Sequence, residues 1–230
     1  MKLTLEEHLQ ELRRRILWIL FILVFFSIVS YPLTPSLLSK IKRDLLRGSS
    51  LVVLSPQEAI LVYIKISLLL GFTLSLPFII FHSWRFIAPG LIEREKRLFL
   101  CIVTSSILLF LLGAGFAYFF LLPITLRFLL EVANWTAVPM LSLDRTINFI
   151  LLIILISGLI FQLPLVVGIL TRLSLVNYKI LSSKRRYVIL LAFIISALIT
   201  DPSMVTQILV AIPIIILYEI SIMVSKILGK

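Results

Sequence analysis

The sequence predicts an all-α integral membrane protein with six transmembrane helices, both termini on the cytoplasmic side, and a short hairpin formed by the fifth and sixth helices. Composition is the first observation behind this prediction. Of the 230 residues, 60% are hydrophobic and 14% are charged, and the mean hydropathy is +1.15. Soluble domains have about 45–50% apolar and about 25% charged residues. A soluble core of this size could not bury so much apolar surface, so the bilayer must serve as its solvent.

The second observation is a series of apolar runs, since about 20 apolar residues in a helix cross the hydrocarbon layer. We expect spans at 16–33, 59–82, 98–122, 147–170, 188–200 and 205–225. The fifth run has only about 13 residues and would cover about 20 Å. Asp201-Pro202 predicts a tight turn after it, and Pro213 lies near the middle of the sixth run. A short hairpin of this kind implies that the bilayer thins beside it. We expect residues 1–230 to form a single domain.

The third observation is where the basic residues lie. Segments 1–15, 83–97, 171–187 and the C-terminal tail carry 15 of the 22 lysines and arginines, whereas the segments between them carry six, and Lys65 lies inside the second run. Cytoplasmic loops are enriched in Lys and Arg, so both termini are predicted to be cytoplasmic. The net charge of +11 would suggest nucleic acid in a soluble protein. Here it follows from membrane topology, and we expect no nucleic-acid partner.

Two segments outside the apolar runs have helical periodicity. In the outer loop 34–58, apolar residues recur at helical spacing and predict a short amphipathic helix on the membrane interface; they are Leu37, Leu38, Ile41, Leu45 and Leu46. Near the N-terminus, Leu5, Leu9, Leu12 and Ile16 share one face. The first helix is therefore predicted to begin before the membrane and to lie partly along the cytoplasmic interface.

Glu11 stands on this N-terminal helix beside three arginines. Its spacing allows an ion pair with Arg14 or Arg15, three or four residues later. The alternative is a carboxylate held out to bind a cationic ligand. The spacing leaves both interpretations open.

The segment 83–97 is too apolar for a free loop. Pro89-Gly90 predicts a turn, but Phe86, Ile87 and other apolar residues surround it. We therefore expect this segment to dock on another part of the protein. Glu95 lies in it among basic residues.

Features that would indicate an enzyme are missing from the sequence. The single cysteine, Cys101, lies in an apolar run, which excludes a disulfide and argues against a cysteine metal site. There is no His-Glu-x-x-His, Gly-x-Ser-x-Gly or Gly-rich phosphate motif. We expect no catalysis, no metal and no cofactor. The polar residues inside the runs, Lys65, Gln162 and Glu219, are either hydrogen-bonding partners between helices or part of a ligand path.

Several motifs in order resemble the TatC family, the receptor and core subunit of the twin-arginine protein translocase, over nearly the whole chain. The motifs are His8-Leu9-x-Glu11-Leu12-Arg13, Phe86-Ile87-Ala88-Pro89 with Glu95 and Arg97, Phe116-Ala117-Tyr118-Phe119 with Pro123, Lys184-Arg185-Arg186-Tyr187, Gln207 with Ala211-Ile212-Pro213, and Tyr218-Glu219-Ile220. The resemblance implies a receptor for signal peptides with consecutive arginines. It assigns Glu11 and Glu95 as the carboxylates that receive the guanidinium groups, with Phe86, Arg13 and Pro89 beside them.

The resemblance also implies partners and a location in the cytoplasmic (inner) membrane. Single-span TatA-type and TatB-type subunits would dock near the fifth and sixth helices, where Thr200 and Gln207 match polar positions. Other copies of the chain and membrane lipid are further expected partners, and the proton-motive force would drive transport. Family members usually have Glu where this chain has Gln162, which cannot carry charge. Two alternatives remain: a small secondary transporter with an enclosed midplane site, and a scaffold or insertase that binds no specific peptide.

Overall fold

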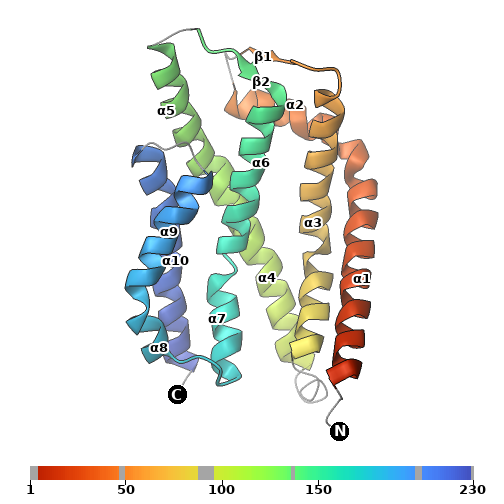
Figure 1. Ribbon diagram of the computed structural model, residues 1–230, viewed down its shortest axis with the longest axis vertical. Coiled ribbons are helices and arrows are strands. Elements are labelled where there is room, and N and C mark those ends of the chain that lie inside the picture. The colour runs from red at the N-terminus through yellow and green to blue at the C-terminus, as the bar shows by residue number, and fades with distance from the viewer. Residues whose placement is uncertain (1–4, 47–49, 88–95, 136–137, 200–203, 229–230) are drawn as a thin grey trace. The chain divides into compact units, whose positions relative to one another are not determined.

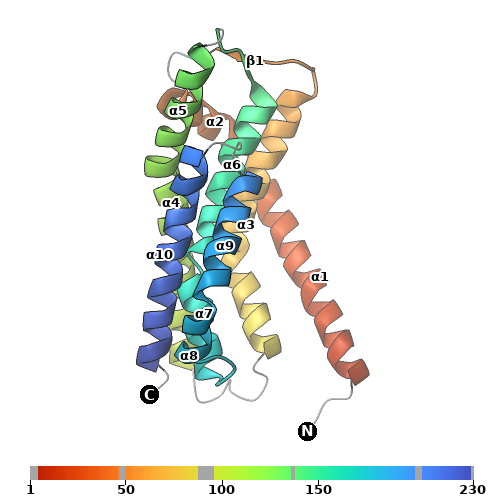
Figure 2. The same ribbon diagram turned by 60° about the vertical axis from the view of Figure 1, so that its left-hand side comes forward.

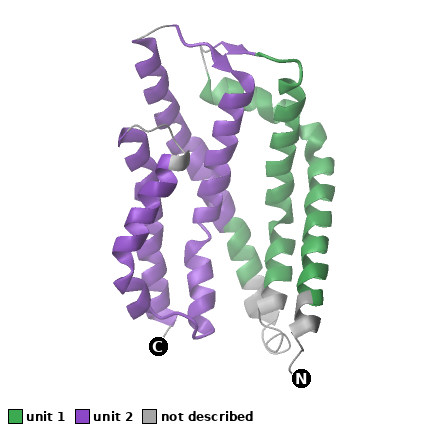
Figure 3. Cartoon of the chain, viewed as in Figure 1, with its two compact units in different colours: residues 1–46, 53–108 green, residues 47–52, 109–230 purple. Residues whose placement is uncertain are grey.

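The computed structural model describes the backbone of residues 5–46, 50–87, 96–135, 138–199 and 204–228 (Figure 1). Within these ranges it also describes the side chains, except at 5–9, 84–87, 96–101 and 198–199. The protein is mostly helical, as predicted. Its chain divides into two compact units, residues 1–46 with 53–108 and residues 47–52 with 109–230 (Figure 3). The single domain stays a prediction.

The first unit is built on two long helices, α1 (Leu5–Ser30) and α3 (Glu58–Ile87), which pack along each other. They approach each other closely at Gly71, where an added Cβ atom would lie 2.6 Å from the backbone nitrogen of Ser27. Only a residue without a side chain fits such a contact. α1 begins well before its apolar run, as the leucine spacing predicted. α3 continues five residues past the expected end of the second span, so the first part of the predicted loop is helical.

Between α1 and α3 the chain forms a 3₁₀ turn, η1 (Tyr31–Leu33), and the helix α2 (Thr34–Leu45). The predicted amphipathic helix is thereby confirmed. Ile41 is fully buried, whereas Lys40, Lys42 and Arg43 are exposed. The helix thus has one apolar and one basic face, as expected for a segment at a membrane interface.

The second unit contains the end of α4 (Lys96–Phe116) and the helices that follow it (Figure 2). These are the π-helical turn η2 (Ala117–Leu121), α5 (Leu122–Asn134), α6 (Leu143–Ile160), α7 (Leu163–Arg172), α8 (Tyr178–Ser183), α9 (Arg185–Ile199) and α10 (Met204–Leu228). Two short strands, β1 (Leu51–Val52) and β2 (Leu141–Ser142), pair in parallel. They join the segment before α3 to the start of α6.

The third helical stretch is much longer than predicted. The expected span ended at residue 122, whereas helix continues through η2 to Asn134. The expected span stops just before Pro123, and proline commonly ends a helix because it lacks an N–H group and its ring clashes with the carbonyl four residues earlier. The wider π-helical turn just before Pro123 accommodates this defect without ending the helix. Arg127, expected in an outer loop, therefore lies in α5.

The fourth span is broken, contrary to the expected continuous run 147–170. α6 ends at Ile160 and α7 begins at Leu163, with Gln162 at the N-cap position of α7, where its side chain makes no capping hydrogen bond. Pro164 in the first turn of α7 explains the break, because it cannot donate to the carbonyl of Ile160. Proline is well tolerated at the start of a helix, where no N–H donor is needed.

Five helical stretches of the described residues are long and apolar enough to cross a membrane. They are Gln10–Leu45, Glu58–Ser83, Ile102–Asn134, Leu143–Arg172 and Met204–Leu228. α9 has 15 residues, so a sixth span there stays a prediction. Pro213 lies inside α10, as expected. The turn predicted at Asp201-Pro202 lies outside the described residues.

Candidate functional site

In the first unit, the carboxylate of Glu11 holds a guanidinium group. One helical turn separates Glu11 from Arg15, so both side chains lie on the same face of α1. Arg15 donates from Nε to Oε1 of Glu11 at 3.0 Å, and its Nη2 forms an ion pair with the same oxygen. The Arg15 side chain is 12% exposed and that of Glu11 is 31% exposed. Of the two interpretations left open by the spacing, the ion pair is thus observed, with Arg15, and the Glu11 side chain remains partly exposed.

The same guanidinium also ties α1 to α3. Arg15 donates from Nη1 to the backbone carbonyl oxygen of His82 at 3.0 Å. A carbonyl oxygen has two lone pairs, so it can accept this bond in addition to a helical one. His82 lies five residues before the end of α3. The carboxylate is therefore held close to the point where the chain leaves α3, and the sequence could not reveal this because the acceptor is a backbone atom.

The remaining residues assigned to a peptide site by resemblance are only partly described. Arg13 is exposed on α1. Phe86 lies in the last turn of α3, with its side chain outside the described part. Pro89 and Glu95 lie outside the described residues. The convergence of Glu11 and Glu95 thus stays a prediction.

Close to the helix break at Gln162 in the second unit, a hydrogen bond joins α4 to α6. Ser157 of α6 donates from Oγ to the backbone carbonyl of Gly113 at 2.9 Å, and both groups are buried. An added Cβ atom at Gly113 would lie 2.7 Å from the Ser157 carbonyl oxygen and 2.8 Å from the ring of Phe161. Gln162 itself is half-buried, and its carbonyl accepts from Val166.

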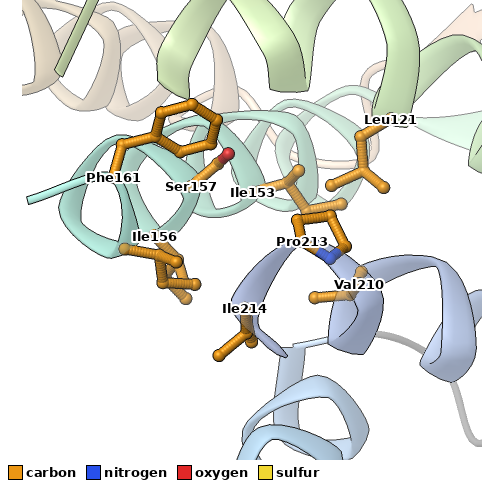
Figure 4. Close-up of a pocket in the computed structure, with 9 residues that line it drawn as sticks. Leu121, Ile153, Ile156, Ser157, Phe161, Val210, Pro213 and Ile214 are labelled. Carbon is orange, nitrogen blue, oxygen red and sulfur yellow. The ribbon is translucent and has the colours of Figure 1, made fainter. Parts of the chain in front are cut away.

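An apolar recess lies beside Ser157 (Figure 4). The recess is narrow, and its lining comes from η2, α6 and α10, with Phe161 just after the end of α6. Pro213 and Val210 of α10 lie across from Ile153 and Ser157 of α6. The one hydroxyl in the lining, that of Ser157, already donates to Gly113. A site for a polar solute needs several convergent polar groups, so this recess does not support the transporter alternative.

The polar residues of the hairpin bond across it. Gln207 of α10 donates from Nε2 to the backbone carbonyl of Phe193 in α9 at 3.0 Å. Glu219 accepts from Nη2 of Arg185 at 2.9 Å. For Glu219 the helix–helix interpretation is confirmed. The bond of Gln207 within the hairpin was not predicted, and docking of a partner at Gln207 stays a prediction. Thr200 lies outside the described residues.

Sequence reasoning missed one further cluster, at the junction of α8 and α9. Tyr218 of α10 donates to the backbone carbonyl of Leu181 in α8 at 2.8 Å, which fixes α8 on α10. Beside it, Lys184 and Arg186 flank the ring of Tyr187. The run Lys184-Arg185-Arg186-Tyr187 was the available signal, but the sequence analysis used it only for membrane topology and for the family resemblance, and neither places two cations at one aromatic ring. Within the described residues, no group of three or more His, Cys, Asp or Glu side chains is placed to hold a metal.

Known proteins resemble this chain over its whole length. The family model for Sec-independent protein translocase protein (TatC) matches residues 7–213. The protein of that name from Aquifex aeolicus is 39% identical over 97% of this chain and 95% of its own. TatCd of Bacillus subtilis is 35% identical over 97% of this chain and 91% of its own. The crystal structure of a twin arginine translocase receptor, TatC, is similar with a TM-score of 0.87 at 38% identity, covering 97% of this chain and all of that one.

These similarities cover both units and more than nine-tenths of each of these three relatives. Together with the apolar helices they identify a multi-pass membrane protein that is a translocase component and not an enzyme. The chain belongs to the TatC family of Sec-independent protein translocase proteins.

Proposed function

We propose that this chain is the receptor for signal peptides with consecutive arginines. In this proposal Glu11 and Glu95 receive the two guanidinium groups at the cytoplasmic face, and Phe86, Arg13 and Pro89 lie beside the peptide. The name of the solved relative, a twin arginine translocase receptor, supports the assignment. The apolar part of the peptide would then follow the membrane-spanning helices.

The observation that carries the proposal is the guanidinium already bound by Glu11. Arg15 demonstrates that this carboxylate accepts an arginine side chain in a charge-assisted pair. Such pairs are directional, and the planar fork of arginine donors matches a carboxylate better than the lysine ammonium does. Since about a third of the Glu11 side chain is exposed, a peptide arginine can approach it from solvent.

Binding at Glu11 then requires an exchange of arginines. The incoming guanidinium replaces that of Arg15, which retains the carbonyl of His82 as an acceptor. Exchanging one Arg–Glu pair for another gains little free energy, so Glu11 contributes to the preference for Arg over Lys more than to affinity. The affinity must come from Glu95 and from burial of the apolar part of the peptide.

The membrane topology and the partners belong to the same proposal. All six predicted spans cross the bilayer with both termini in the cytoplasm, and α9, at about 22 Å, crosses where the bilayer is thin. TatA-type and TatB-type subunits dock beside α9 and α10, near Thr200 and Gln207, and further copies of the chain assemble with them. The proton-motive force drives export of the folded cargo.

A titration of the purified chain tests the receptor function. An Arg-Arg signal peptide should bind at least about tenfold more tightly than its Lys-Lys counterpart, because a hydrogen bond to a charged group is worth about 1.5–3 kcal/mol. Glu11→Gln and Glu95→Gln should each remove most of this preference. Glu131→Gln, the same change at an exposed position of α5, is the matched control. Raising the ionic strength should weaken binding.

Two results would contradict the proposal. Equal affinity for the two peptides would favour the scaffold alternative. Equal effects of Glu11→Gln and Glu131→Gln would show that the net charge, and not this carboxylate, governs binding.

A further inference from the structure

The junction of α8 and α9 carries a concentration of positive charge. Segment 171–187 contains five basic residues and no acidic one. Glu219 neutralises one of them through its ion pair with Arg185. Lys184 and Arg186 are exposed, and no carboxylate of the described residues forms an ion pair with either.

Both cations lie over the aromatic ring of Tyr187. Nζ of Lys184 lies 5.2 Å from the ring centroid, and Cζ of Arg186 lies 4.9 Å from it. Arg186 also donates from Nη2 to the Tyr187 hydroxyl at 3.0 Å. The aromatic face offsets part of the repulsion between two like charges. One anionic group beside the hydroxyl would offset the remainder.

The position of the cations in the fold strengthens the need for an anion. Arg186 lies in the first turn of α9, where the helix dipole is positive and acidic residues are normally preferred, and Lys184 lies just before this turn, at the C-cap of α8. The first turn of α9 has no acidic residue. Two contacts with α10 hold the junction in place, the Tyr218–Leu181 hydrogen bond and the Glu219–Arg185 ion pair. The cationic groups are therefore presented on a fixed frame.

The surface next to the cations is apolar. One face of α9 continues from Tyr187 as Leu190, Leu191 and Ile194, which are 60%, 53% and 48% exposed. We call these three residues the α9 stripe. In a membrane-spanning protein such a stripe contacts acyl chains. The anion that fits this surface thus has a charged head and long apolar tails.

We propose that Lys184 and Arg186 bind the phosphate of an anionic phospholipid at the Tyr187 ring. The acyl chains of this lipid lie along the α9 stripe, and the headgroup fixes the depth of the short hairpin in the bilayer. Basic side chains near an anionic membrane surface contribute about fivefold each to binding. Loss of both charges should therefore lower the affinity roughly 25-fold. The site goes beyond peptide recognition and does not depend on it.

Native mass spectrometry of the full chain in detergent, titrated with phosphatidylglycerol and phosphatidylcholine, tests the proposal. The wild type should retain phosphatidylglycerol preferentially. Lys184→Gln combined with Arg186→Gln should lose that preference, with phosphatidylcholine binding unchanged. Lys184→Arg combined with Arg186→Lys keeps both charges and should retain it. Lys40→Gln combined with Lys42→Gln, which removes two exposed charges from α2, is the matched control.

Three results would overturn the proposal. Equal loss in the α2 variant and the α9 variant would mean that overall charge sets lipid retention. A preference that survives loss of both charges at the junction, in protein that unfolds at the wild-type temperature, would place the lipid elsewhere. Stabilisation by inorganic phosphate as large as that by phosphatidylglycerol would indicate a free anion as the ligand.

Discussion

Arg15 of α1 donates to the backbone carbonyl of His82 in α3 at 3.0 Å, across 67 residues of sequence. The same side chain carries the ion pair with Glu11. The charge state of position 11 and the packing of α1 on α3 are therefore linked through one guanidinium. Changes at Arg15 should affect both the stability of the first unit and the access of ligands to Glu11.

The first prediction concerns stability. Arg15→Gln removes the charge from the His82 contact and leaves Glu11 without this partner, so the free energy of unfolding should fall by about 1–2 kcal/mol, an estimate reduced for the partial exposure of the pair. Arg13→Gln, the same change at an exposed position of α1, should stay within about 0.5 kcal/mol of the wild type. Unfolding in detergent, followed by circular dichroism, measures both. Equal effects would mean that the Arg15 contacts add nothing to packing.

The second prediction concerns peptide binding. If an incoming arginine must displace Arg15, then Arg15→Gln should bind the Arg-Arg peptide more tightly, by up to about tenfold, whereas Glu11→Gln should bind it more weakly. The two variants change the same ion pair, so an effect of lost pairing alone would have the same sign in both. Calorimetric titration distinguishes these outcomes. Weaker binding by Arg15→Gln would show that Arg15 supports the site instead of competing for it.

The helical organisation could largely be predicted because it depends on side-chain character. Apolar runs marked the helices, the spacing of Leu37, Leu38 and Ile41 predicted α2, and the spacing of Glu11 and Arg15 allowed their ion pair. The structure departs from the prediction where backbone groups determine whether a helix continues. Pro123 interrupts no helix because a π-helical turn precedes it, whereas Pro164 separates α6 from α7. The sequence has the same residue at both places, and only the local backbone distinguishes them.

The same limit applied to the candidate sites. The Arg15–His82 and Ser157–Gly113 bonds both use a backbone carbonyl as acceptor, and every residue has one, so no sequence pattern marks them. Gly113 gave a weak signal, since glycine inside an apolar helix often has a packing reason. The neighbouring Gly115 gives the same signal without such a reason.

The third prediction uses these two glycines. Gly113→Ala would place a Cβ atom 2.7 Å from the Ser157 carbonyl and against the Phe161 ring, so α4 and α6 must separate. Overpacking of this kind costs about 1–3 kcal/mol. At Gly115 an added Cβ meets nothing within 4 Å, so Gly115→Ala should be neutral or stabilising, because alanine favours helix over glycine by about 1 kcal/mol. Thermal unfolding of both variants decides, and a Gly115→Ala protein as unstable as Gly113→Ala would contradict the packing explanation.

The fourth prediction concerns the end of α7, where Ser174 has a positive φ of 58°. The N–H of Ser174 donates to the carbonyl of Thr171, and the N–H of Leu175 donates to that of Leu170, both at 3.0 Å. This pattern is the Schellman motif, in which glycine normally occupies the position of Ser174. A side chain in the left-handed region costs about 1–2 kcal/mol.

Ser174→Gly should therefore raise the free energy of unfolding by about 0.5–1 kcal/mol, part of the relieved strain being offset by the greater freedom of glycine in the unfolded chain. Ser39→Gly is the matched control, because Ser39 lies inside α2, where glycine weakens the helix by about 0.5 kcal/mol relative to serine. The two identical substitutions should thus change stability in opposite directions. Urea unfolding of each variant in detergent measures both changes. A loss of stability in both variants would mean that glycine does not stabilise the turn after α7.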